Sequence, residues 1–210
     1  MNRKVNNVSA ERQRRRRKPE AAESEILSAA DNFLREAPFR DMTIDDIMAG
    51  TGLSRPSFYE YFRDRYQLVI RLAQPFGPRH TAICEDWLRA QQPKERLPNV
   101  LREIAELYAS DGHVIRALAD AADGDDQVEI AYRRATQKGI EDVAQRIRED
   151  AERGLTDLQD LEPIELAAAL IHLTQNYFIE KLGRRPKADP RMVADTLTAI
   201  WMRVLYGDSR

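Results

Sequence analysis

Two glycines separated by a single residue, Gly50 and Gly52, interrupt a stretch of helical sequence and constrain the fold more than any other feature of the chain. Before them, Thr43 and Asp46 resemble a capping box, with Asp in place of the usual Glu or Gln, and predict a helix that begins here. After them, helical signals resume over residues 54–61. Glycine permits the tight turn that joins two short helices in a helix-turn-helix. We therefore expect such a motif in the N-terminal part of the chain.

The second of these helices has a defined beginning and one apolar face. Ser54 is a predicted N-cap, and Pro56 lies in the first turn, where its missing N–H group costs little. Ser54 and the backbone N–H groups that follow it also form a helix N-terminus, which is a natural site for a phosphate. Phe58 and Phe62, four positions apart, are predicted to pack against the preceding helices. The other side chains of the helix are predicted to face solvent.

The polar side chains of this helix suit a DNA groove. Arg55 can donate two hydrogen bonds to the O6 and N7 atoms of guanine. The hydroxyl groups of Ser57, Tyr59 and Tyr61 can donate to phosphates, and such contacts position a protein without recognising the base sequence. Both tyrosines have an alternative role, in which they pack within the small domain. Glu60 either accepts a hydrogen bond from the N4 atom of a cytosine or points away from the DNA.

Prolines and glycines divide the remaining sequence into further helical segments. A pattern that starts near Asp64 meets Pro75 and Pro78, which we expect to kink or break the helix. Helices are then expected at about 94–110, 112–122, 126–153, 163–182 and 189–206. No segment has a convincing strand pattern, so the expected fold class is all-α.

Positive charge is concentrated at the N-terminus. Residues 1–19 contain eight Lys or Arg and one acidic residue, a net charge of +7, whereas the whole chain carries −2. Basic N-terminal arms often bind nucleic acid, and a disordered solubilising tail is the alternative. No apolar run approaches the roughly 18 residues of a membrane span, and no signal peptide is visible. With Cys84 as the single cysteine, we expect a cytoplasmic protein without an intrachain disulfide.

The sequence lacks the motifs of common enzymes and metal sites. We find no nucleophile elbow, phosphate loop, HExxH motif or plausible Cys–His pairing, and we expect no enzymatic activity. The acidic residues between Asp120 and Glu129 do not have the spacing of a calcium loop, because Gly124 comes too early. A solvated connection between helices is the better interpretation. Three histidines and one cysteine do not predict a zinc site, and we expect no metal or cofactor.

The helix-turn-helix region resembles the DNA-binding signature of the TetR family of transcription regulators. The resemblance covers residues 21–70 and lies in Thr43-Ile44, Ile47, Gly52-Leu53-Ser54, Tyr59, Tyr61-Phe62 and Leu68. It implies that Thr43 touches a phosphate, that the start of the second helix faces the bases and that Arg65, where the family usually has lysine, reaches the DNA backbone. The basic arm would reach into an adjacent minor groove. The expected DNA-binding residues are Arg14, Arg15, Arg16, Arg17, Lys18, Thr43, Ser54, Arg55, Pro56, Ser57, Tyr59, Tyr61 and Arg65.

The same resemblance implies a domain organisation and a homodimer. We expect a disordered basic arm over 1–19, a three-helix helix-turn-helix DNA-binding domain over 20–66, and a six-helix ligand-binding and dimerisation domain over 67–210. In the family the last two helices, here 163–182 and 189–206, form a four-helix bundle with the partner chain; packing within their own domain is the alternative. A two-fold dimer doubles the base contacts, which predicts a palindromic operator in double-stranded DNA.

A ligand pocket is expected among the helices of the larger domain. The candidate residues, for which ordinary core packing is the alternative, are Phe76, Trp87, Tyr108, His113, Thr174, Gln175, Asn176, Tyr177 and Phe178. Residues 168–170, Thr174 and 200–207 resemble the subgroup that contains the ethionamide-resistance repressor, which implies a small hydrophobic effector. The sequence thus favours a repressor that an effector releases from its operator. A constitutive or architectural DNA-binding protein without a regulatory ligand is the alternative.

Overall fold

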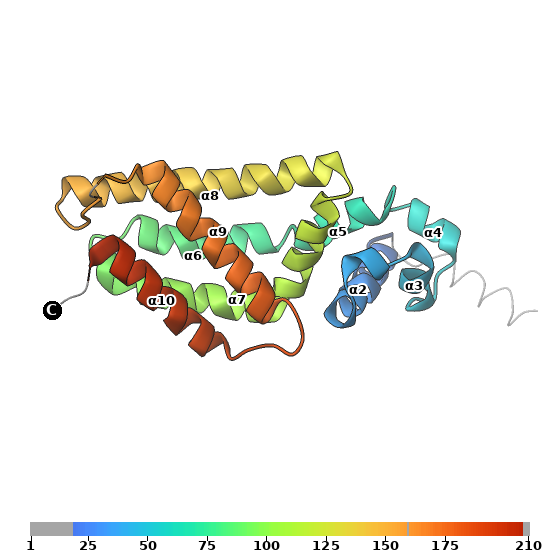
Figure 1. Ribbon diagram of the computed structural model, residues 1–210. Helices are drawn as coiled ribbons and strands as arrows, with labels where there is room; N and C mark the ends of the chain where they lie inside the picture. The colour runs from blue at the N-terminus through green and yellow to red at the C-terminus, as the bar shows by residue number, and fades with distance from the viewer. Residues whose placement is uncertain (1–18, 159, 208–210) are drawn as a thin grey trace, which may run out of the picture. The chain divides into compact units, whose positions relative to one another are not determined.

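The regular elements of this protein are all helices among the residues that the structure describes (Figure 1). The structure is a computed structural model and describes residues 19–158 and 160–207. The expected all-α class is confirmed. The chain divides after Leu68 into two compact units, whereas the sequence placed a boundary after residue 66. None of the described helices has the length and apolar character needed to span a membrane.

The smaller unit contains the helix-turn-helix. Its elements are α2 (Pro19–Glu36), the short 3-10 helix η1 (Phe39–Asp41), α3 (Ile44–Ala49), α4 (Arg55–Tyr59) and the start of α5 (Arg65–Ala73). Packing of α3 against both α2 and α4 holds the unit together. Its fully buried side chains include Ile26, Ala30, Leu34, Met42, Ile47, Phe58 and Leu68. These positions on α2 repeat every four residues, which is why one face of that helix lies in the core.

Reciprocal hydrogen bonds fix the beginning of α3. The Thr43 hydroxyl accepts from the Asp46 backbone N–H at 3.2 Å, and the Asp46 carboxylate accepts from the Thr43 backbone N–H at 3.0 Å. Both bonds of a capping box are therefore present, as the sequence predicted. These bonds also lower the pKa of the Asp46 carboxyl below its ordinary value, because they favour its charged form.

The turn between α3 and α4 needs Gly50 for a different reason from the one expected. Gly50 has φ −80°, an ordinary value for any residue. A Cβ atom on Gly50 would, however, lie 3.3 Å from the Cβ atom of Ala29, so the absence of a side chain lets α2 approach the turn. The Gly52 backbone N–H donates to the Glu25 carboxylate at 2.7 Å, which fastens the turn to α2.

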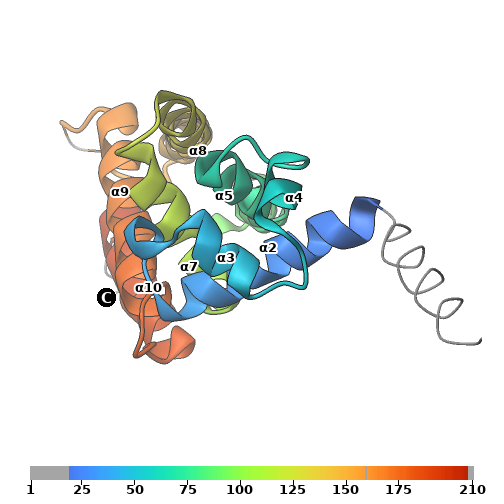
Figure 2. The same cartoon turned by 90° about the vertical axis from the view of Figure 1, so that its right-hand side faces the viewer.

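The larger unit is a bundle of antiparallel and crossing helices built around α7. Its helices are α6 (Phe76–Leu88), α7 (Pro93–Ala122), α8 (Asp126–Glu152), α9 (Pro163–Leu182) and α10 (Pro190–Tyr206). Each of the other four packs against α7. The last two helices, α9 and α10, lie side by side on one side of the bundle (Figure 2).

Two sequence-based expectations for helix boundaries had different outcomes. The expected break between α5 and α6 is confirmed, because α5 ends at Ala73 and α6 begins at Phe76 after Pro75. The expected separation of 94–110 from 112–122 is wrong, because both ranges belong to the single helix α7. Gly112 does not end this helix. A Cβ atom there would lie 3.2 Å from the Cα atom of Gly183, so Gly112 allows the end of α9 to pack closely on α7.

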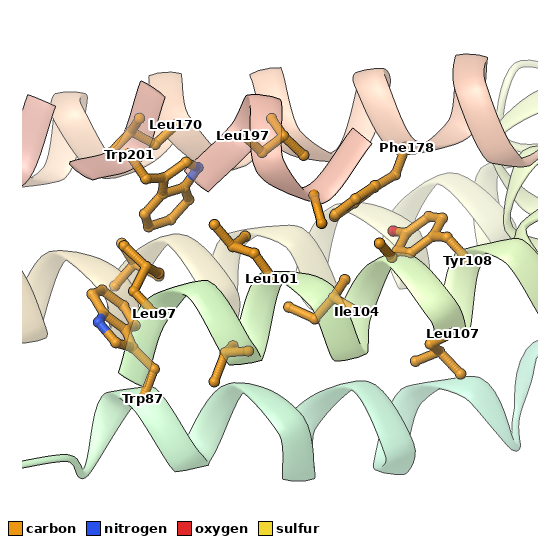
Figure 3. Packing of buried hydrophobic residues seen from close by; sticks show 14 of the residues in the cluster. Trp87, Leu97, Leu101, Ile104, Leu107, Tyr108, Leu170, Phe178, Leu197 and Trp201 are labelled. Atoms are coloured by element: carbon orange, nitrogen blue, oxygen red, sulfur yellow. The ribbon is translucent and has the colours of Figure 1, made fainter. Parts of the chain in front are cut away.

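Apolar side chains form a continuous core in the larger unit. Figure 3 shows Leu97, Leu101, Ile104 and Tyr108 in a row along α7, with Trp87 from α6 on one side and Leu170, Phe178, Leu197 and Trp201 from α9 and α10 on the other. The two tryptophan rings meet edge to face, with their centroids 5.8 Å apart. The indole N–H of Trp201 donates to the Thr174 hydroxyl at 2.8 Å, so its polar atom is satisfied within the core.

A buried ion pair ties three helices of this unit together. The side chains of Arg146 and Asp150 on α8 are only 4% and 2% exposed, and the Arg146 Nη2 atom donates to the Asp150 carboxylate at 2.7 Å. Arg146 also donates to the carbonyl oxygens of Leu88 and Ala90 at the end of α6. The Tyr206 hydroxyl, at the end of α10, donates to Asp150 at 3.0 Å. The pair therefore satisfies polar groups from α6, α8 and α10 at once.

We predict that Arg146→Ala lowers the free energy of unfolding of the larger unit by about 3–5 kcal/mol, because the buried Asp150 carboxylate loses its buried partner and keeps only the more distant Arg153, at 3.5 Å. Arg133 on the same helix is the matched control, since it forms an exposed pair with Glu129. Arg133→Ala should change the stability by no more than about 0.5 kcal/mol. Urea unfolding followed by circular dichroism measures both changes. A loss below about 1 kcal/mol for Arg146→Ala would contradict the role given to this pair.

Candidate functional site

The helix α4 exposes a small polar surface because one of its faces is anchored in the core. Phe58 is fully buried, and its ring lies 5.5 Å from that of Phe62. Pro56 lies in the first turn, as the sequence predicted. Ser54 occupies the N-cap position, but its side chain makes no capping hydrogen bond; its Oγ atom instead lies 3.0 Å from the Oγ atom of Ser57.

Arg55 is held by an acidic side chain across the turn. Its Nη1 atom lies 2.5 Å from both carboxylate oxygens of Asp45, a residue of α3. Hydrogen bonds with Tyr59 and Asp45 raise the pKa of the Arg55 guanidinium above its ordinary value, so this side chain is fully charged. Tyr59 itself is 50% exposed. Sequence analysis missed Asp45, because nothing in the sequence pairs a residue before the turn with one ten positions later.

The remaining predicted DNA contacts have varied surroundings. Thr43, Ser54 and Pro56 are exposed, whereas Ser57 and Tyr61 are partly buried. The basic residues Arg14 to Lys18 lie outside the described part of the chain.

Arg65 has a role inside the smaller unit. Its Nη1 atom donates to the carbonyl oxygens of Met42 at 2.8 Å and Phe39 at 3.3 Å. Its guanidinium also stacks over the ring of Phe39, 4.7 Å from the centroid. These contacts fasten the start of α5 to the segment that precedes α3. A phosphate contact through its other N–H groups stays a prediction.

A cavity of about 660 Å³ lies among α6, α7, α8 and α9 of the larger unit, and exposed side chains of α6 and α8 form part of its wall. Its lining combines apolar side chains with a few polar ones, among them His80, Thr136 and Gln175. A second cavity of about 60 Å³ shares part of this wall and extends towards Trp87 and Trp201. The combined size and the mostly apolar lining are typical of sites for small organic molecules.

The structure brings six of the predicted ligand-binding residues to these two cavities: Phe76, Trp87, Tyr108, Thr174, Gln175 and Phe178. It places three others elsewhere. His113 is buried in α7 but does not line either cavity, Asn176 is exposed and donates to the His172 carbonyl, and the ring of Tyr177 faces Lys181. The helical period explains this separation, since positions 174, 175 and 178 of α9 share one face.

Several lining residues on α6 and on α8 were not predicted from the sequence. His80 and Cys84 are one helical turn apart on α6, and both line both cavities. Their spacing of four residues places both side chains on one face of a helix, and the sequence could have indicated this. The lining residues of α8, such as Thr136 and Gly139, lie in a strongly charged helix beside its buried stripe of Ile140, Val143 and Ile147. Their residue types gave no sign that they line a cavity.

Two titratable groups of the cavity wall, His80 and Cys84, are uncharged at neutral pH. Burial lowers the pKa of the His80 imidazole below its ordinary value, which favours the neutral ring. Burial also raises the pKa of the Cys84 thiol to about 12, so it stays protonated. The Cys84 sulfur lies 3.7 Å from the Nδ1 atom of His80.

The cations of the cavity wall each have an acidic partner, whereas the Glu149 carboxylate of the wall accepts from the Gln145 side chain. Arg89 lies 3.1 Å from the Glu85 carboxylate, and Lys138 forms an ion pair with Asp142. The third cation of the wall, Arg146, has the buried partner described above. Each lining cation of these two cavities thus has an acidic partner. The cavity offers no free positive charge to an anionic ligand.

No group of three or more potential metal ligands occurs within residues 19–158 and 160–207. In the acidic segment that precedes α8, the Asp125 carboxylate accepts hydrogen bonds from the backbone N–H groups of Gln127 and Val128. This segment therefore contains the N-cap of α8.

Family models match both parts of the chain. A model of bacterial regulatory proteins of the tetR family matches residues 26–72, and a model of the C-terminal domain of the transcriptional regulator EthR matches residues 97–207. The HTH-type transcriptional regulator EthR of Mycobacterium tuberculosis is 29% identical over 210 residues, which is 97% of this chain and 96% of that protein. The EthR of Mycolicibacterium smegmatis is 25% identical over 188 residues, 88% of this chain and 86% of that protein.

Solved structures share the fold at low sequence identity. The MbdR regulator from Azoarcus sp. CIB has a TM-score of 0.73 and 20% identity, with 90% of this chain and all of that chain covered. The TetR-family regulator PfmR from Thermus thermophilus has a TM-score of 0.69 and 16% identity, with 89% and 96% covered.

The helix-turn-helix and the helical unit with its cavity define a DNA-binding transcription regulator. The chain belongs to the TetR family of transcriptional regulators, and its larger unit belongs to the EthR C-terminal domain family.

We predict that acid destabilises the larger unit in part through His80. Since the folded state lowers the pKa of this residue, its contribution to stability is present above about pH 6.5 and is lost as the pH falls through the folded pKa. The loss of stability between about pH 7.5 and about pH 5.5, from urea unfolding, should therefore be smaller in His80→Gln than in the unchanged protein. Equal losses in the two proteins would show that His80 is not held neutral by burial.

Proposed function

We propose that this protein is a homodimeric repressor that binds a palindromic operator and is released by a small, uncharged hydrophobic effector. The observation that carries the proposal is the large cavity in the larger unit of a chain whose smaller unit exposes Arg55 on a helix-turn-helix. The relatives named above are transcriptional regulators. A cavity of this size is the natural place for the molecule that regulates DNA binding.

The lining of the cavity supports an uncharged effector. A carboxylate or phosphate buried there would meet neutral His80 and cations that already have acidic partners. Burying a charge without a partner is unfavourable, so anionic molecules should bind weakly. The smaller cavity, which Trp87 and Trp201 both line, suits an apolar group, while Gln175 offers hydrogen bonds to one polar group.

Exposed apolar side chains on α9 and α10 support dimerisation through these helices. Leu173 on α9 is 44% exposed, and Met192 and Val204 on α10 are also exposed. Large apolar side chains that stay in contact with solvent along two adjacent helices are typical of a subunit interface. A symmetric pair of chains would then bind two half-sites, which is why we propose a palindromic operator.

Release requires that the effector prefers one conformation of the dimer. A ligand changes the equilibrium between two conformations only if it binds them with different affinities. His80 and Cys84 place α6 in the cavity wall, and α6 begins only three residues after the end of α5, which starts in the smaller unit. We propose that the effector displaces α6 and that this short connection passes the displacement to α5. Because the helix is broken at Pro75, α5 and α6 can change their orientation relative to each other at this connection.

Tryptophan fluorescence tests the effector site, because Trp87 and Trp201 are the only tryptophans of the chain and both line the smaller cavity. Decan-1-ol should change the fluorescence saturably, and decanoate should bind at least about tenfold more weakly, because its carboxylate would be buried without a partner.

The variant Gly139→Leu tests whether the alcohol binds in the larger cavity. Gly139 lines the larger cavity, and a Cβ atom there meets nothing within 4 Å, so leucine should fill the cavity without a clash. Leucine also has the higher helix propensity, so the variant should remain folded. We predict that it binds decan-1-ol more weakly than the unchanged protein. Equal binding of alcohol and carboxylate, or no effect of Gly139→Leu, would contradict the proposed site.

Arg55→Ala tests the proposed base contact. Operators are first selected from a random DNA library with the full-length protein. If Arg55 recognises a base, the variant should lose about 1–3 kcal/mol of preference for the selected operator over scrambled DNA. Arg40→Ala removes an exposed charge from the same unit and should leave that preference unchanged. If Arg55→Ala loses the same affinity for the selected operator and for scrambled DNA, Arg55 contacts a phosphate and does not recognise a base.

A further inference from the structure

We infer that Asp45 is a positioning residue, which holds the Arg55 guanidinium ready for its base contact and thereby sets sequence discrimination. This inference rests on the proposed contact of Arg55 with a base. Asp45 lies in the first turn of α3, and Arg55 is the first residue of α4, so the pair crosses the turn of the helix-turn-helix.

The geometry of the pair leaves one edge of the guanidinium available. Both carboxylate oxygens of Asp45 lie 2.5 Å from the same Nη1 atom of Arg55. Arginine has five N–H donors in a planar fork, and the Nη2 and Nε groups provide the remaining ones. Two acceptors on a base edge, such as O6 and N7 of guanine, can be bound by that pair of donors. Asp45 therefore fixes the plane of the guanidinium and leaves its Nη2 and Nε donors available.

Asp45 is itself held in place by its helix. The capping box formed by Thr43 and Asp46 fixes the first turn of α3 on both sides of Asp45. Tyr59, which lies one turn further along α4, also helps to raise the pKa of the Arg55 guanidinium. The guanidinium is thus held by an acidic side chain of the preceding helix, α3. An arginine side chain that is ordered before binding loses less conformational freedom when it meets DNA.

The exposure of the pair argues against a role in stability. The Arg55 and Asp45 side chains are 52% and 69% exposed, and ion pairs this open to water contribute little to folding. On DNA, however, water is displaced from the pair and its attraction becomes stronger. A carboxylate near a polyanion also weakens binding to every sequence, and pairing with Arg55 limits that repulsion. The effect of Asp45 should therefore appear in discrimination between sequences.

The test measures how Asp45→Ala changes discrimination between operators. The full-length protein is titrated, by fluorescence anisotropy, into the operator selected from a random library and into a set in which each base pair of one half-site is replaced singly. Arg55→Ala, the double variant Asp45→Ala with Arg55→Ala, and Asp41→Ala are measured in parallel. Asp41 is the matched control, an exposed acid of the same unit that pairs with Arg40. Thermal unfolding confirms that each variant is folded.

We expect Asp45→Ala to lower discrimination on the order of tenfold at the base pair where Arg55→Ala abolishes it. In the double variant, loss of Asp45 should have no further effect, because the two residues act as one unit. Asp41→Ala should discriminate like the unchanged protein.

Two results would overturn the inference. If Asp45→Ala binds all sequences more tightly and discriminates as before, Asp45 only masks the charge of Arg55. If Arg55→Ala abolishes discrimination while Asp45→Ala leaves it unchanged, the positioning role fails and the proposed base contact stands. Unchanged discrimination in Arg55→Ala would instead remove the base contact, and the inference with it.

Discussion

The buried pair of Arg146 and Asp150 connects the part of the larger unit that holds the cavity with the ends of two neighbouring helices. Arg146 lines the cavity and satisfies carbonyl oxygens at the end of α6, while Asp150 accepts from Tyr206 at the end of α10. An ion pair in this position contributes less to net stability than to the arrangement of the groups around it, because its desolvation offsets much of its attraction. The shape of the cavity depends on this arrangement.

The local signals of the sequence predicted the helix-turn-helix well and the larger unit less well. The capping box of Thr43 and Asp46 is a contact within four residues, so the residue types alone indicated it. The Gly112–Gly183 contact and the pair of Asp45 and Arg55 join positions that only the fold brings together. This is why α7 was expected as two helices and why Asp45 was missed. For the cavity, the aromatic residues of α6, α7 and α9 were predictable, whereas the lining of the charged helix α8 was not.

The two units suggest how a ligand-responsive regulator differs from a constitutive DNA-binding protein. An exposed arginine on a helix-turn-helix serves both kinds of protein. A large cavity with a mostly apolar lining has no purpose in DNA binding itself, and it favours regulation by a ligand. The break between α5 and α6, which the prolines predicted, separates the helix in the cavity wall from the helix that starts in the smaller unit. In the proposed mechanism, rotation at this break carries the effect of the ligand.

The central claim is that occupancy of the cavity and affinity for the operator are coupled. The most direct measurement is the affinity of the full-length protein for its selected operator with and without saturating decan-1-ol, together with the reverse titration of decan-1-ol with and without operator. Linkage requires the same factor in both directions, and we predict a weakening of about fivefold or more that is reduced in Gly139→Leu. Unchanged operator affinity while decan-1-ol occupies the cavity would contradict the account and favour constitutive DNA binding.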